Sequence, residues 1–183
     1  MRRFWEKAKI KESAKKPGIT GFYRLIKEYK IMIKILFVCH GNICRSTMCE
    51  SVFTYMVKEK GLENQFIIDS CATSTEEIGN PPHRGTVKKL REVNIPIVPH
   101  RARQITWSDY KKFDYIIGMD TWNIRNLNRM LKGDPDGKVY KLLSFAGSER
   151  NIADPWYTGN FDVTYDDVVE GCKALLEHIL SEM

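Results

Sequence analysis

Apolar positions change their period several times between residue 32 and the end of the chain. Residues 32–38, MIKILFV, form a nearly continuous apolar run rich in β-branched side chains. Such a run is typical of a strand that is buried on both faces of a parallel sheet. Further runs of the same kind occur at residues 65–70, 113–119 and 138–143. We therefore expect four strands.

Between these runs, apolar residues recur at intervals of three and four. One such segment begins at about Ser46 and is closed by Gly61, and others cover residues 84–93, 120–132 and 163–181. This period predicts amphipathic helices. Strands that alternate with helices favour right-handed crossovers and a sheet covered on both faces. The fold class we predict is a single α/β domain, with a four-stranded parallel sheet, helices on both faces and a phosphate-binding loop after the first strand.

Charge is distributed unevenly along the 183 residues. The chain has 29 Lys and Arg against 23 Asp and Glu, but residues 1–31 contain 10 of the basic residues and 3 of the acidic ones. The remainder is nearly neutral, so we expect no nucleic-acid partner. Residues 1–31 are expected to be a basic, weakly ordered N-terminal extension, or to precede a natural start at Met32. A short basic amphipathic helix is possible in their second half, and the domain is expected at 32–183.

The cysteines indicate a reducing compartment. Five is an odd number, no secretory hydrophobic region opens the chain, and neither paired C-x-x-C motifs nor a zinc-type histidine spacing occurs. We therefore expect no disulfide framework and no metal site. No apolar run reaches the roughly 18–20 residues of a membrane span, so we expect a cytoplasmic protein without stable membrane insertion. The five cysteines are Cys39, Cys44, Cys49, Cys71 and Cys172.

The segment after the first strand has the composition of an anion-binding loop. Gly41 and Asn42 tolerate left-handed backbone conformations, which lets a loop curl with its N–H groups inward. The helix that begins at Ser46 adds unpaired N–H groups and the positive end of its dipole. Arg45 adds a planar fork that holds two oxygens. Residues 39–46 therefore predict a site for a tetrahedral dianion such as phosphate.

A sulfur at the base of this loop points to reaction rather than binding alone. The donors that hold phosphate also stabilise a thiolate, and Ser46 is placed to donate its hydroxyl to Cys39. Cys39 would then attack phosphorus as a nucleophile. The alternative is an inert cysteine buried after a core strand. Cys39 and Arg45 at this spacing around Gly41 and Asn42 favour the nucleophile.

VCHGNICRS resembles the phosphate loop, C-x5-R-S, of the low-molecular-weight protein tyrosine phosphatases. The resemblance covers about residues 33–181 and implies that Cys39 is the nucleophile, Arg45 the phosphate clamp and Asp154 the general acid. Further segments that look like family segments, in family order, are 69–74, 78–82, 102–106, 113–116 and 154–155.

The chemistry calls independently for an acid such as Asp154. A phenolate leaves more easily at neutral pH when a proton is supplied to it. Pro155 restricts the backbone just after Asp154 and would help to fix its direction. In the second step the carboxylate would deprotonate the attacking water. Without the resemblance, Asp-Pro would be read as a simple turn.

The resemblance also assigns supporting and pocket residues. It implies a hydrogen-bond network under the loop, and aromatic walls suited to a flat phenyl ring. Glu76 departs from the family, because a wall aromatic is usual there, and we expect it to favour basic neighbours in the substrate. Cys44 would protect an oxidised Cys39 through a disulfide, or simply fill the loop. The network residues are Asn42, Ser46, Ser70 and His100; the expected substrate-binding residues are His40, Gly41, Asn42, Ile43, Cys44, Ser46, Glu76, Trp156 and Tyr157.

The expected function is metal-independent and cofactor-independent hydrolysis of protein phosphotyrosine. Three alternatives stay open. An arsenate reductase of this fold would need relay cysteines, and none lies between Cys71 and Cys172. A bacterial phosphoarginine phosphatase would have Thr where this chain has Ile43, and a non-catalytic phosphate-binding module would not need the cysteine, arginine and acid together.

Overall fold

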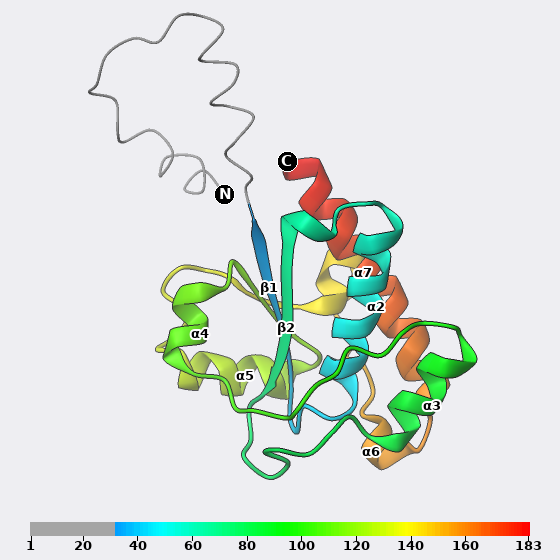
Figure 1. Cartoon of the computed structure of the whole chain (residues 1–183). Helices are drawn as coiled ribbons and strands as arrows, with labels where there is room; N and C mark the ends of the chain where they lie inside the picture. Colours follow the sequence, from blue (N-terminus) through cyan, green and yellow to red (C-terminus); the bar gives the residue numbers. More distant parts are fainter. Residues whose placement is uncertain (1–31) are drawn as a thin grey trace, which may run out of the picture. The chain divides into compact units, whose positions relative to one another are not determined.

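A computed structural model describes residues 32–183 (Figure 1). The expectations for residues 1–31 lie outside the described residues. Within residues 32–183, four parallel strands form one sheet in the order β2-β1-β3-β4. This confirms the predicted α/β class. The strands are β1 (Ile33–Cys39), β2 (Phe66–Ala72), β3 (Tyr115–Gly118) and β4 (Val139–Lys141).

The four expected helices are present, and the structure adds short elements that the sequence pattern did not predict. The expected helices are α2 (Arg45–Glu59), α3 (Arg84–Glu92), α5 (Thr121–Met130) and α7 (Phe161–Glu182). The additional elements are the helices α4 (Trp107–Lys112) and α6 (Pro155–Thr158) and the 3₁₀ turns η2 (Glu63–Gln65) and η3 (Leu142–Ala146).

Local capping explains the unexpected helices better than periodicity does. Thr106 and Asp109 form a reciprocal capping box at the start of α4, and Asp154 caps α6. Such short helices are set by their first turn and have no measurable apolar period. The expected strand at 138–143 was too long, because Leu142 and Leu143 turn into η3 and are buried.

The sheet is packed on both faces, as Figure 1 shows, with α2 and α7 covering one and α4 and α5 the other. Successive side chains of β1 enter different cores. Ile35 and Phe37 join the cluster that contains the apolar side chains of α2 and α7, whereas Leu36 and Val38 pack with Tyr110 of α4 and neighbouring residues. Two-sided burial is the reason for the continuous apolar run in this strand.

This topology brings several loops to the carboxyl edge of the sheet. The loop 39–46 follows β1, and its strand partners at that end are Ala72 of β2 and Gly118 of β3. Ligands of open parallel sheets bind at this edge. No helix within residues 32–183 combines the length and apolar character needed to cross a bilayer.

Candidate active site

The loop 39–46 curls because one of its residues adopts a left-handed conformation. Asn42 has φ of 59° and is fully buried. The carbonyl oxygens of His40 and Ile43 accept backbone N–H bonds from segments outside the loop, at 3.0 and 2.7 Å. The N–H groups of Gly41 and Ile43 donate to no described acceptor. With carbonyls bonded outward and N–H groups left free, the loop has the character of an anion-binding nest.

Cys39 lies at the base of this loop with two polar groups at its sulfur. Its Sγ is 3.1 Å from Oγ of Ser46 and accepts the N–H of Asn42 at 3.2 Å. Ser46 Oγ itself accepts a hydrogen bond from Asn42 Nδ2 at 3.0 Å. Because that bond occupies a lone pair of the hydroxyl, its proton is available to the sulfur. Both contacts bring a hydrogen-bond donor to the sulfur of Cys39.

Asn42 is the centre of the network beneath the loop. Its Nδ2 donates to Oγ of Ser70 at 2.9 Å, in addition to Ser46. Its Oδ1 accepts from Nε2 of His100 at 2.8 Å and from the backbone N–H of Arg103 at 3.1 Å. The structure therefore brings together all four residues that the sequence analysis placed in this network. The side chain fixes a backbone conformation that costs a non-glycine residue free energy.

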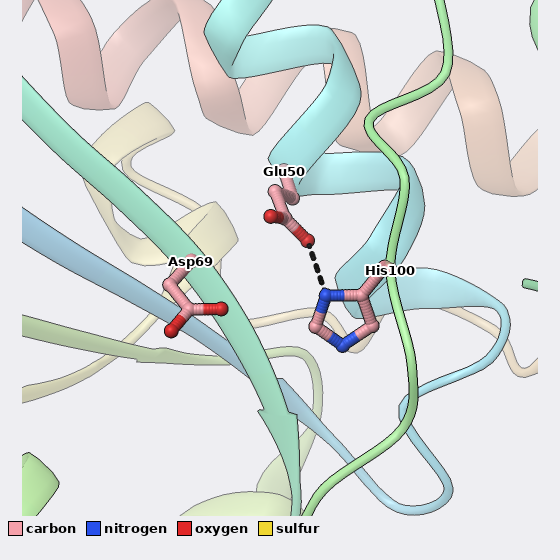
Figure 2. A group of neighbouring side chains, drawn as sticks. All are labelled: Glu50, Asp69 and His100. Atoms are coloured by element: carbon pink, nitrogen blue, oxygen red, sulfur yellow. Dashed lines mark ion pairs between the residues drawn. The ribbon is translucent and has the colours of Figure 1, made fainter. Parts of the chain in front are cut away.

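Glu50 completes the network and was missed in the sequence analysis. Figure 2 shows it between α2 and the loop that carries His100, with Asp69 nearby on β2. Its Oε2 accepts from Ser70 Oγ at 2.7 Å and lies 3.3 Å from Nδ1 of His100. Burial raises the pKa of Glu50 to about 7 and lowers the pKa of His100. A sequence signal existed, since Glu50 follows Ser46 by four residues and shares its helix face.

The same cluster could in principle hold a metal ion. Oxygen and nitrogen atoms of Glu50, Asp69 and His100 lie within 4.8 Å of one another. However, Nε2 of His100 already bonds to Asn42, and Oε2 of Glu50 already accepts from Ser70. The arrangement is accounted for by support of the loop.

Arg45, the first residue of α2, holds two carboxylates from distant segments. Its Nη1 donates to Asp120 and to the carbonyl of Ile152, and its Nη2 donates to Asp154. Its buried Nε has no partner among the described residues. Burial opposes the charge, but Cys39, Asp154 and Asp120 together raise the pKa of Arg45. Asp120 was also missed, although its place two residues beyond β3 is a signal for the site.

Asp154 is held at the N-terminus of α6. Its Oδ1 accepts the backbone N–H of Trp156 at 3.1 Å, while its Oδ2 pairs with Arg45. Pro155 is the first residue of this helix, where a missing N–H costs nothing. Because each of its two oxygens has a partner, the carboxylate is held in one orientation, on the side of the pocket where Arg45 lies.

A pocket opens above Cys39. Most of the residues expected to bind substrate line it, and Glu77 is an additional lining residue. Asn42, Arg45 and Ser46 are buried beneath the lining residues. His40 Nε2 and Glu76 Oε2 are 3.0 Å apart at the exposed rim. The lining residues are Cys39, His40, Gly41, Ile43, Cys44, Glu76, Glu77, Asp154, Trp156 and Tyr157.

The other cysteines differ in position. Cys44 is a buried free thiol in the loop, and burial, followed by the charges of Cys39 and Asp154, raises its pKa to about 12. Cys49, Cys71 and Cys172 are fully buried in the cores, as expected for packing residues.

A parallel α/β sheet with a Cys-x5-Arg loop at its carboxyl edge defines the class of cysteine-dependent phosphatases and their relatives. The family model described as low molecular weight phosphotyrosine protein phosphatase matches residues 34–183. The chain therefore belongs to this family, which confirms the resemblance noted in its sequence.

Individual members of the family resemble this chain in sequence and in structure over most of its length. The chain is 40% identical over 153 residues to the low molecular weight protein-tyrosine-phosphatase YfkJ of Bacillus subtilis, covering 82% of this chain and 98% of the relative. It is 44% identical over 151 residues to the low molecular weight phosphotyrosine protein phosphatase of Gallus gallus, covering 78% and 93%. The crystal structure of YfkJ superposes with a TM-score of 0.80 at 41% identity, covering 82% of this chain and 96% of that one. DARP, a drosophila arginine phosphatase, gives a TM-score of 0.74 at 30% identity, covering 80% and 98%.

Proposed function

We propose that this protein hydrolyses phosphotyrosine in proteins through a cysteinyl-phosphate intermediate. The observation that carries the proposal is one pocket lined by Cys39 and Asp154. The two polar partners of the Cys39 sulfur and the guanidinium that pairs with Asp154 are buried beneath it. Cys39, Arg45 and Asp154 are a nucleophile, an anion clamp and a proton donor, which are the groups that phosphomonoester cleavage needs.

In the first step, the thiolate of Cys39 attacks phosphorus and the bond to the phenolic oxygen breaks. Asp154 in its protonated form gives its proton to the departing oxygen, so tyrosine leaves neutral. The buried Nε of Arg45, which has no partner among the described residues, and the free N–H groups of Gly41 and Ile43 are suited to the phosphoryl oxygens. Charge that develops on those oxygens meets donors already in place.

In the second step, Asp154, now a carboxylate, removes a proton from water, and the hydroxide attacks phosphorus. The bond to sulfur breaks, phosphate is released and Cys39 returns to the thiolate. Ser46 donates to that sulfur in the proposed scheme, which makes the thiolate a better leaving group. No metal ion or cofactor takes part in either step.

The pocket walls support an aryl phosphate. Trp156 and Tyr157 supply flat apolar surface, and Ile43 brings an aliphatic side chain to the lining. The similarity to DARP, named an arginine phosphatase, keeps phosphoarginine as the second candidate. Ile43 has no hydroxyl to bond a guanidinium and favours phosphotyrosine. The arsenate reductase alternative is weakened because Cys172, which follows Cys71 along the chain, is fully buried.

The cellular compartment of the enzyme follows from the same cysteine chemistry. A nucleophilic Cys39 with a second thiol, Cys44, in the same loop must stay reduced to work. We place the enzyme in the cytoplasm, acting on phosphotyrosine-containing proteins and not on nucleic acid.

The test replaces the nucleophile. Cys39→Ser is expected to lower turnover of a phosphotyrosine peptide by at least about 10³-fold, because a serine hydroxyl is a far weaker nucleophile at neutral pH. Phosphate binding should remain measurable by calorimetry. Phosphotyrosine, phosphoserine and phosphoarginine peptides are compared side by side with the unaltered protein.

Cys71→Ser is the matched control, because it makes the same substitution at a buried cysteine of the neighbouring strand. It is expected to keep most of the turnover. Undiminished turnover in Cys39→Ser would exclude Cys39 as nucleophile, and a preference for phosphoarginine would replace the proposed substrate.

A further inference from the structure

A second, more open groove lies beside the catalytic pocket. The two share one residue, Trp156, which is 57% exposed. A chain bound with its phosphorylated side chain in the pocket can therefore continue over Trp156 into the groove. The residues that line the groove are His83, Arg84, Gly85, Lys88, Pro155, Trp156, Gly159 and Phe161.

Part of the groove is closely packed and hydrogen-bonded to the catalytic loop. The rings of His83 and Phe161 stack at 5.4 Å with 4° between their planes, and Trp156 meets His83 edge-on at 5.8 Å. A Cβ added to Gly85 would lie 2.3 Å from the ring of Phe161, so Gly85 permits this close packing. The backbone N–H of His83 donates to the carbonyl of Ile43 at 2.7 Å. This hydrogen bond joins the start of α3, on one side of the groove, to the catalytic loop.

The groove is basic. Arg84 forms no ion pair with a described residue, and Lys88 is 80% exposed with Glu92, 3.7 Å away, as its partner. The next lysine along, Lys89, is already paired with Asp162 at 2.5 Å. Arg84 and Lys88 therefore leave two cationic groups that a ligand can reach.

The catalytic pocket has the opposite charge at its rim. Glu76 and Glu77 line the pocket but not the groove, whereas Arg84 and Lys88 line the groove but not the pocket. A substrate that spans both sites would meet acidic side chains around its phosphotyrosine and basic ones beyond Trp156. Acidic substrate residues would be repelled at the pocket rim and attracted in the groove, so both effects contribute to specificity.

We propose that the groove formed by His83, Arg84, Lys88 and Trp156 binds an acidic side chain of the protein substrate, near the phosphotyrosine along the chain. The inference rests on the proposed function. Each extended residue spans at most about 3.5 Å, and the groove shares Trp156 with the pocket. We therefore expect the acidic residue within about three positions of the phosphotyrosine. Arg84 and Lys88 are specificity residues; they take no part in phosphoryl transfer.

The experiment compares three phosphotyrosine peptides that differ in charge. One is neutral, and the others have two Glu residues on the N-terminal or the C-terminal side. The full-length protein is expected to prefer one acidic peptide over the neutral one by about three- to tenfold in kcat/KM, mainly through KM, since exposed ion pairs are individually weak. In Arg84→Ala/Lys88→Ala, this ratio is expected to fall to about one.

A matched control removes the same charge elsewhere. Lys58 and Lys60 are exposed at the far end of α2 from Arg45, so Lys58→Ala/Lys60→Ala should keep the preference. If both double variants lost the preference for the acidic peptide equally, the preference would be due to net charge alone, and the proposal would be overturned. So would equal kcat/KM for all three peptides with the unaltered protein.

Hydrolysis of a small aryl phosphate separates this inference from the proposed function. If the unaltered protein hydrolyses neither that ester nor any peptide, the proposed function fails. If it hydrolyses the ester and the neutral peptide but shows no acidic preference, the groove proposal alone fails. A preference for a second phosphotyrosine without any preference for Glu would also overturn the proposal as stated.

Discussion

Arg45 brings two carboxylates together through one guanidinium, and they arrive from different parts of the chain. Asp120 follows β3, whereas Asp154 precedes α6. Nη1 is held by Asp120 and the carbonyl of Ile152, so the contact of Nη2 with Asp154 is made by an anchored group. This arrangement allows Asp120 to fix Arg45 while Asp154 exchanges protons with the substrate.

Removal of Asp154 should therefore depend on the leaving group. Asp154→Ala is expected to lower the rate of phenol release from phosphotyrosine by about 10²–10⁴-fold, because the phenolate then departs without a proton. An ester of a more acidic nitrophenol should lose much less. The measurement is the pre-steady-state rate of phenol release, which reports the first step alone.

Asp120→Asn is the control for this prediction. It disturbs the same guanidinium but removes no proton donor, so its losses should be similar for both esters. Equal losses for both esters in Asp154→Ala would exclude Asp154 as the general acid.

The loop 39–46, with the network beneath it, acts as one element. Asn42 supplies the turn and also the side chain that holds it, through bonds to Ser46, Ser70, His100 and the Arg103 backbone. Removal of the side chain leaves several buried polar groups with one partner fewer. The cost should appear in both stability and turnover, since the same bonds orient the Ser46 hydroxyl.

Two asparagine-to-glycine variants, one in the network and one outside it, test this dual role. Asn42→Gly keeps the left-handed backbone accessible but removes the side chain, and should lower the free energy of unfolding by about 2–4 kcal/mol. Turnover should fall as well. Asn94 has almost the same conformation, with φ of 57°, but is exposed, so Asn94→Gly should change stability by less than about 0.5 kcal/mol. Similar effects in a urea titration would show that the network contributes nothing.

At the scale of the whole molecule, α7 packs very closely against η3, which directly follows the last strand of the sheet. A Cβ at Gly171 of α7 would lie 2.5 Å from Cγ of Leu142, which begins η3 and is fully buried. Helix propensity alone would favour Ala at this position by about 1 kcal/mol. Overpacking against a side chain with no free space costs about 1–3 kcal/mol.

We expect overpacking to prevail over helix propensity. Gly171→Ala should lower the free energy of unfolding by up to about 2 kcal/mol, measured by chemical denaturation. In the background Leu142→Ala, which opens the space, the same substitution should cost less or even stabilise, so the two effects should be non-additive. Additive effects would show that the two side chains do not compete for space.

The sequence allowed the regular elements and the loop to be predicted because their signals are local. The run at 32–38 and the residues from Cys39 to Ser46 contain their own periodicity and turn preferences. The short helix α4 was missed because its 6 residues are too few to repeat an apolar period, and its capping box, Thr106 with Asp109, marks only the start. Leu142 and Leu143 continue the apolar pattern of a strand. In the structure they form a 3₁₀ turn, and this turn buries both side chains against α7.

By itself the sequence determined the parallel α/β fold and an anion-binding loop with a cysteine at its base, since backbone preferences and apolar period act between neighbours along the chain. Only the tertiary structure decided which distant groups meet that loop. Asp120 and Asp154 reach Arg45, and Glu50 on α2 reaches His100, because folding brings these segments, which are distant along the chain, together around the loop. The basic groove beside an acidic pocket rim arises in the same way, since charges separated along the chain become a pattern only when the chain folds.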